Sequence, residues 1–217
     1  MQLDRTQALR YLGYGKNEPD ARTAALLGEC AAEIEALSTI RTIHRVYPDL
    51  CVTADTVSIG GVVFGSRDLA KTLAGCGRAV ILCATLGAEA DRLRLRCSST
   101  DLAKAAVMDA AQSAYIEQVC DRFCETFRES FEAAGLNLTA RYSPGYGDLS
   151  IRYQPQLLAL ADAPRRIGLI CSDSCMLLPQ KSVTAVIGLT AGEPHCGDRC
   201  KSCENYAVCR YRRQDGV

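Results

Sequence analysis

The sequence has no excess of charge of either sign, because 25 Lys and Arg residues balance 25 Asp and Glu residues. A chain without net charge lacks an overall field with which to hold nucleic acid or an anionic membrane. It also lacks a window of about 18 uncharged apolar residues, the length that a membrane-spanning helix needs. The N-terminal stretch has no apolar run followed by a small-residue cleavage site. We therefore expect a cytoplasmic protein that binds neither nucleic acid nor membrane.

The common nucleotide-binding motifs are also missing. There is no GxGxxG after a predicted strand and no P-loop lysine motif. The sequence shows no internal repeat and no low-complexity linker, and its predicted strands and helices do not alternate regularly. This order favours an α+β fold over a doubly wound parallel sheet.

Cysteine, in contrast, is abundant, with 13 residues in 217. Without a signal peptide, a disulfide scaffold is the poorer explanation, because the cytosol keeps thiols reduced. Nine of the cysteines are scattered, and most of these lie in apolar or helical sequence, where a free Cys acts as a small hydrophobe. The other four crowd near the C-terminus with the spacing C-x3-C-x2-C-x5-C; they are Cys196, Cys200, Cys203 and Cys209.

Hydrophobic periodicity and capping residues predict the main elements. We expect a short helix near the N-terminus, a helix capped by Asp20, a helix capped by Ser66 and a polar helix over 88–98. The longest predicted helix runs over 101–134. Its apolar stripe makes it a packing axis: Ile116, Cys120, Phe123, Phe127 and Phe131. A further short helix covers 154–161. Short strands are expected over 40–47 and over 51–66 with a break at Gly60–Gly61. Further strands are expected over 78–87, over 166–174 and after a turn at Pro179.

Residues 141–148, "RYSPGYGD", contain too many turn-forming residues for a helix or a central strand and are too aromatic for an ordinary loop. Pro144 fixes φ, and the two glycines permit positive φ, so backbone groups are exposed to close approach. Arg141 offers a planar fork for a carboxylate, and Tyr142 and Tyr146 offer rings and hydroxyls. The loop suits a small ligand with a carboxylate and a flat ring. The alternative is a structural turn with tyrosines packed on it.

This loop resembles the Arg-x-x-Pro-Gly-Tyr signature of the activation domain of vitamin B12-dependent methionine synthase, in which the loop binds S-adenosylmethionine. The stretch 173–189, "DSCMLLPQKSVTAVIGL", resembles the second signature of that family, and the two occur in the family's order. The likeness covers residues 100–190 well and the first hundred loosely. It implies a curved, mainly antiparallel sheet flanked by helices over 1–190. The resemblance says nothing about the Cys-rich stretch over 191–217, which we expect to form a separate tail.

The resemblance also implies which residues bind the cofactor. Arg141 corresponds to the arginine that meets the cofactor's carboxylate, and Tyr146 to the tyrosine of the same site. Ser143 stands where the family uses backbone contacts beside a small residue. Glu117 lies on the long helix about where the family has an acid facing the cofactor, with a solvated surface acid as the alternative. The family's tyrosine after the second signature has no counterpart in "IGLTAGEPHC". Lys181 either lines the cofactor cleft or faces a partner.

The function implied by the resemblance is that of a stand-alone module. It would bind S-adenosylmethionine and support the reductive methylation, and so the reactivation, of a cobalamin-dependent methionine synthase in trans. The cobalamin would belong to that partner, because this chain has no room for the substrate barrels and no visible cobalt-ligand motif; we assign it no catalytic residue. Two alternatives remain open: a reactivator of another corrinoid methyltransferase, and a zinc-stabilised interaction module without cofactor binding.

The cysteine tail is a candidate metal site in its own right. Thiolates this close in sequence can converge on one metal, because short loops cost little entropy to close. The staggered single spacings favour a 4Fe–4S cluster held by four cysteines, which could relay an electron. A structural zinc site usually pairs two C-x2-C units, and only one is present, so zinc is the alternative. Disulfides and an empty site are the remaining interpretations.

Overall fold

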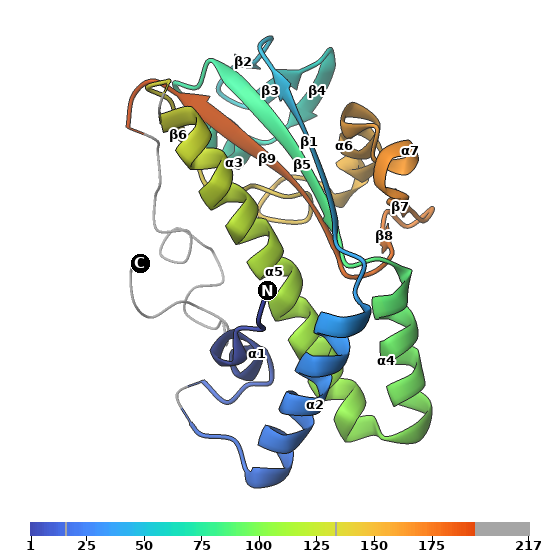
Figure 1. The fold of residues 1–217 in the computed structure, drawn as a ribbon. Coiled ribbons are helices and arrows are strands. Elements are labelled where there is room, and N and C mark those ends of the chain that lie inside the picture. The colour runs from blue at the N-terminus through green and yellow to red at the C-terminus, as the bar shows by residue number, and fades with distance from the viewer. Residues whose placement is uncertain (16, 133, 194–217) are drawn as a thin grey trace.

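The computed structural model describes residues 1–15, 17–132 and 134–193 (Figure 1). Residues 194–217, which include the four cysteines of the predicted tail, lie outside the described residues. At the centre of the fold is an antiparallel four-stranded sheet with the strand order β1–β5–β9–β6. Its strands are β1 (Arg41–Tyr47), β5 (Arg78–Thr85), β6 (Asn137–Leu138) and β9 (Ser182–Thr190). The expected α+β architecture with an antiparallel sheet flanked by helices is confirmed.

Both faces of the central strand β5 are covered, as its almost uniformly apolar sequence requires. Successive side chains of a strand point to opposite faces. Val80 and Leu82 accordingly pack with Phe127 on one face, whereas Ile81 packs with Leu157 on the other. The alternation therefore requires a packed layer on each side of the sheet.

One of these layers is built on α5 (Leu102–Glu132), which crosses a face of the sheet (Figure 1). Three helices gather around its N-terminal half: α1 (Arg5–Tyr11), α2 (Ala21–Leu37) and α4 (Ala88–Thr100). Ile116 and Cys120 of the predicted stripe pack with these helices, while Phe123, Phe127 and Phe131 pack toward the sheet. The long helix is therefore the packing axis that its apolar stripe predicted.

The opposite layer is assembled from smaller elements. A three-stranded antiparallel sheet contains β2 (Cys51–Val52), β3 (Thr56–Ile59) and β4 (Val62–Gly65), followed by α3 (Arg67–Thr72). The 3-10 helix η1 (Ile151–Tyr153) leads into α6 (Gln154–Ala161) and α7 (Ala163–Ile167). A two-stranded hairpin pairs β7 (Ile170–Cys171) with β8 (Leu177–Leu178). No helix in the part of the chain that the structure describes is long and apolar enough to cross a membrane.

The strand expected over 166–174 is wrong. Its first residues end the helix α7, which begins beside Pro164, and only Ile170–Cys171 are extended. Proline is favoured in the first turn of a helix, and Gly168 ends this one with a φ of +69°. Pro164 therefore helps to start a short helix before the apolar run, and Gly168 ends that helix within it. The short strands expected over 51–66 are present as β2, β3 and β4, with the expected break at Gly60–Gly61.

Candidate functional site

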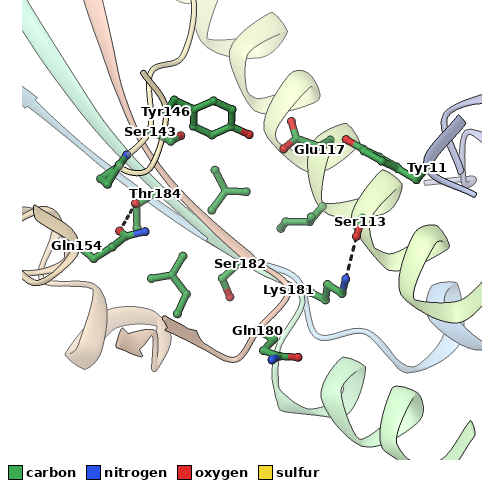
Figure 2. A pocket seen from close by; sticks show the side chains of 14 residues that line it. Tyr11, Ser113, Glu117, Ser143, Tyr146, Gln154, Gln180, Lys181, Ser182 and Thr184 are labelled. Atoms are coloured by element: carbon green, nitrogen blue, oxygen red, sulfur yellow. Dashed lines mark hydrogen bonds between the residues drawn. The ribbon is translucent and has the colours of Figure 1, made fainter. Parts of the chain in front are cut away.

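A cleft of about 370 Å³ opens where α5, the 141–148 loop and the start of β9 meet (Figure 2). This volume is within the range of roughly 300–1,000 Å³ that is usual for small-molecule sites. The lining comes from seven segments, including α1, α6 and β8. It consists of Tyr11, Ser113, Ile116, Glu117, Ser143, Pro144, Tyr146, Gln154, Leu177, Gln180, Lys181, Ser182, Val183 and Thr184.

The 141–148 loop is attached to the central sheet at its first residues. The Tyr142 amide donates to the Val186 carbonyl at 2.9 Å, and the Val186 amide donates back at 2.8 Å. The chain then reverses through Gly145 and Gly147, whose φ angles are +93° and +50°. Both glycines therefore have the positive φ that the sequence predicted, and the turn brings Ser143 and Tyr146 to the cleft.

Asp148 anchors the other end of the loop at the N-terminus of α3. Its carboxylate accepts from Ser66 Oγ at 2.5 Å, from the Arg67 amide at 2.8 Å and from the Asp68 amide at 3.3 Å. Burial alone would raise the pKa of Asp148, but these hydrogen bonds outweigh it and lower the pKa from its ordinary value. The ionised carboxylate thus stabilises both the loop and the start of the helix.

We predict that Asp148→Asn lowers the free energy of unfolding by about 0.5–2 kcal/mol at pH 7, the usual cost of losing a helix-capping group. Because the folded-state pKa is lowered, the contribution of Asp148 is complete above the unfolded value of about 3.9. It is lost as the pH falls through the folded-state pKa. Urea unfolding of both proteins between pH 7 and pH 2.5 measures this. A difference between them that does not shrink at low pH would contradict the assignment.

Arg141 forms an ion-pair cluster with two carboxylates of α5. Its Nη2 is 2.8 Å from Glu117 Oε2, and its Nη1 is 2.7 Å from Asp121 Oδ1. The arginine side chain is only 12% exposed. Glu117 and Asp121 are one helical turn apart on α5, so one guanidinium fork bridges both carboxylates. Burial alone would lower the pKa of Arg141, but its anionic neighbours raise it overall.

The cleft floor is fixed by the turn between β8 and β9. Lys181 Nζ lies 2.8 Å from Asp109 Oδ1 and donates to Ser113 Oγ at 2.8 Å, which joins the turn to α5. The Gln180 amide donates to Asp91 of α4 at 3.0 Å. Lys181 thus lines the cleft, which is one of the two placements that the sequence left open; the other was a position facing a partner.

Three of the four predicted cofactor-binding residues, Glu117, Ser143 and Tyr146, line the same cleft. Arg141 does not line the cleft, but its guanidinium forms an ion pair with Glu117, which does. Their roles remain predictions. The sequence reasoning missed Tyr11, whose pKa is raised by burial and by the nearby charge of Glu117.

It also missed Gln154 and Thr184, which are buried polar residues. The sequence around Tyr11 does not indicate a place in the cleft, because the packing of the N-terminal helix α1 brings the residue there. A glutamine opening an otherwise apolar helix, "QPQLLALA", is the one sequence signal that could have drawn attention to Gln154.

The four tail cysteines predicted as metal ligands, 196, 200, 203 and 209, lie outside the described residues. Among residues 1–193, apart from the undescribed 16 and 133, no group of three or more His, Cys, Asp or Glu could hold a metal ion. Burial raises the pKa of the Cys30, Cys83 and Cys120 thiols to about 12. These three are therefore unreactive packing residues, as expected.

A solved structure, described as the "Crystal Structure of the MetH Reactivation Domain bound to AdoHcy", superposes on this chain with a TM-score of 0.62. The match covers 89% of this chain and 75% of that one. The fold of this chain is that of the MetH reactivation domain. The fold that the two signatures implied is thereby confirmed. At 14% identity the similarity to the MetH reactivation domain shows the fold alone. No protein-family model and no curated protein matches the sequence.

Proposed function

We propose that this chain binds S-adenosylmethionine in the cleft and supports the reductive methylation of a cobalamin-dependent methionine synthase in trans. The observation that carries the proposal is the cleft itself. Three residues that the family resemblance assigns to the cofactor meet in it, on a fold that has been solved elsewhere with AdoHcy bound. AdoHcy is S-adenosylmethionine without the transferable methyl group, so a site shaped for one accommodates most of the other.

In this proposal the charged groups of the ligand replace contacts within the protein. The ligand's carboxylate takes Arg141 Nη2, and its ammonium takes the carboxylate of Glu117 that Arg141 releases. Asp121, 2.7 Å from Arg141 Nη1, keeps the guanidinium in place during this exchange. Each charge exchanges one charged partner for another, so no buried charge is left unpaired. Ser143 and Tyr146 contact the remainder of the ligand.

The chemistry also needs a partner. A corrinoid protein supplies the cobalamin, which accepts one electron and the sulfonium methyl group and leaves AdoHcy as the product. The role of this chain is to bind the methyl donor and to present its methyl group. A methionine synthase is the proposed partner, with another corrinoid methyltransferase as the alternative, because the cleft residues do not distinguish the two.

Titration calorimetry with S-adenosylmethionine and AdoHcy, with and without the corrinoid partner, tests the binding claim. We expect binding of both ligands, and conversion of oxidised cobalamin in the partner to its methylated form, followed by absorbance, when a reductant is supplied. Absence of binding under all conditions would refute the proposal. It would favour the zinc-stabilised interaction module, which the missing family tyrosine also favours.

For the tail over 191–217 we propose a 4Fe–4S cluster on the four cysteines, which would relay the electron. Protein purified anaerobically should be brown and contain about four irons per chain. Cys203→Ser should lose the colour, whereas Cys51→Ser, at an exposed cysteine of β2, should keep it. A colourless protein with one zinc per chain would refute the electron relay and support the zinc alternative.

A further inference from the structure

Gln154 is a buried polar residue in the wall of the cleft. It is the first residue of α6 and is only 6% exposed. Buried amide side chains are normally hydrogen-bonded at both ends, because an unpaired buried donor or acceptor loses its hydration without compensation. The partners of its two ends therefore indicate what the residue does.

One end of the Gln154 amide is held by the protein. Its Oε1 accepts from Thr184 Oγ1 at 2.5 Å, and Thr184, on β9, is 1% exposed. This bond sets the rotation of the amide. Its Nε2 donates to no residue in the part of the chain that the structure describes, and Figure 2 shows it turned toward the open part of the cleft. Gln154 therefore presents an N–H donor to the cleft in a fixed direction.

The position of this donor determines which part of a ligand it meets. Gln154 and Glu117 lie on opposite sides of the cleft (Figure 2). If the amino-acid end of the ligand pairs with Glu117 and Arg141, the other end of the molecule extends toward Gln154. The cleft also has apolar lining suited to the faces of a flat ring, from Pro144, Leu177 and Val183.

We propose that Gln154 Nε2 donates a hydrogen bond to a ring nitrogen of the adenine base, and that Thr184 positions it to do so. This inference rests on the proposed function. Thr184 fixes the amide through Oε1, so that Nε2 presents its N–H to the base in one direction. The site therefore selects a base with an in-plane acceptor at that position. A base that has C–H at that position leaves the buried N–H of Gln154 unpaired. An unpaired buried donor costs more than the loss of an apolar contact, so the site discriminates strongly against such a ligand.

Three analogues of AdoHcy test this, each with a C–H in place of one ring nitrogen, at N1, N3 or N7. Wild-type protein should bind one of the three about five- to a hundredfold more weakly than AdoHcy, the loss that follows when one buried donor goes unpaired. In Gln154→Met, which keeps the length and loses the amide, that analogue and AdoHcy should bind equally. Thr184→Val, which removes the positioning hydroxyl, should reduce the discrimination.

Gln156→Met is the matched control, since Gln156 lies on the same helix and does not line the cleft; it should keep the wild-type pattern. If wild-type protein and Gln154→Met show the same ratios for all three analogues while AdoHcy binds, this inference is overturned and the proposed function stands. If Gln154→Met does not fold, wild-type protein that binds all three analogues as tightly as AdoHcy likewise overturns the inference. If wild-type protein binds neither AdoHcy nor S-adenosylmethionine, the proposed function itself fails.

Discussion

Replacing Arg141 with alanine should weaken S-adenosylmethionine binding by about 1.5–3 kcal/mol, the value of a hydrogen bond to a charged group. The expected loss corresponds to roughly ten- to a hundredfold in the dissociation constant. The loss arises because the ligand's carboxylate no longer has its cationic partner. Glu117 and Asp121, no longer bridged at 2.8 Å and 2.7 Å, also repel each other across one turn of α5, which lowers the stability of the folded protein. Titration calorimetry on the two proteins measures the change.

The same substitution removes contacts from the folded protein, so stability has to be measured beside affinity. Arg122→Ala is the matched control, because Arg122 is an exposed arginine of α5 that does not line the cleft. It should leave both properties unchanged. A folded Arg141→Ala protein with unchanged affinity would mean that Arg141 only holds α5 and that residues 141–148 form a structural turn.

The features that the sequence predicted correctly depend on neighbours along the chain. The carboxylate of Asp20 accepts from the Thr23 amide at 2.9 Å, and Ser66 Oγ accepts from the Leu69 amide at 3.0 Å, so both are N-caps. The glycines of the 141–148 loop have positive φ for the same local reason. Capping and backbone freedom are decided within three or four residues, and sequence periodicity and composition report on that range.

The cleft could be predicted only in part, because most of it depends on contacts between distant segments. The family resemblance indicated both Glu117 and Arg141, which are 24 positions apart, but nothing in the sequence indicated that they pair with each other. Tyr11 reaches the cleft because α1 packs on α5, where Gln118 accepts from the Asp4 amide at 2.8 Å. The contact between Gln154 and Thr184 spans 30 positions in the same way. Tertiary packing, which has no local signature, selects these residues.

The strongest effect on the loop itself is expected from Gly147→Ala. An added Cβ at this position would collide with Tyr142 Oη and with the carboxylate of Asp68, at a φ of +50°. Left-handed backbone costs a non-glycine residue about 1–2 kcal/mol, and overpacking a filled site adds about 1–3 kcal/mol. The Tyr142 hydroxyl donates to the Tyr146 carbonyl at 3.3 Å, so its displacement should also move Tyr146 out of its place in the cleft.

Gly145→Ala separates the two costs, because Gly145 has a φ of +93° but no atom within 4 Å of an added Cβ. We expect Gly145→Ala to lower the free energy of unfolding by about 1–2 kcal/mol, and Gly147→Ala by about 2–5 kcal/mol. Ligand affinity should fall further in Gly147→Ala than in Gly145→Ala, because only the former displaces Tyr142. Urea unfolding and calorimetry on the two variants measure these differences. Equal losses in both would show that backbone conformation alone, and not contact with Tyr142 and Asp68, requires glycine in this loop.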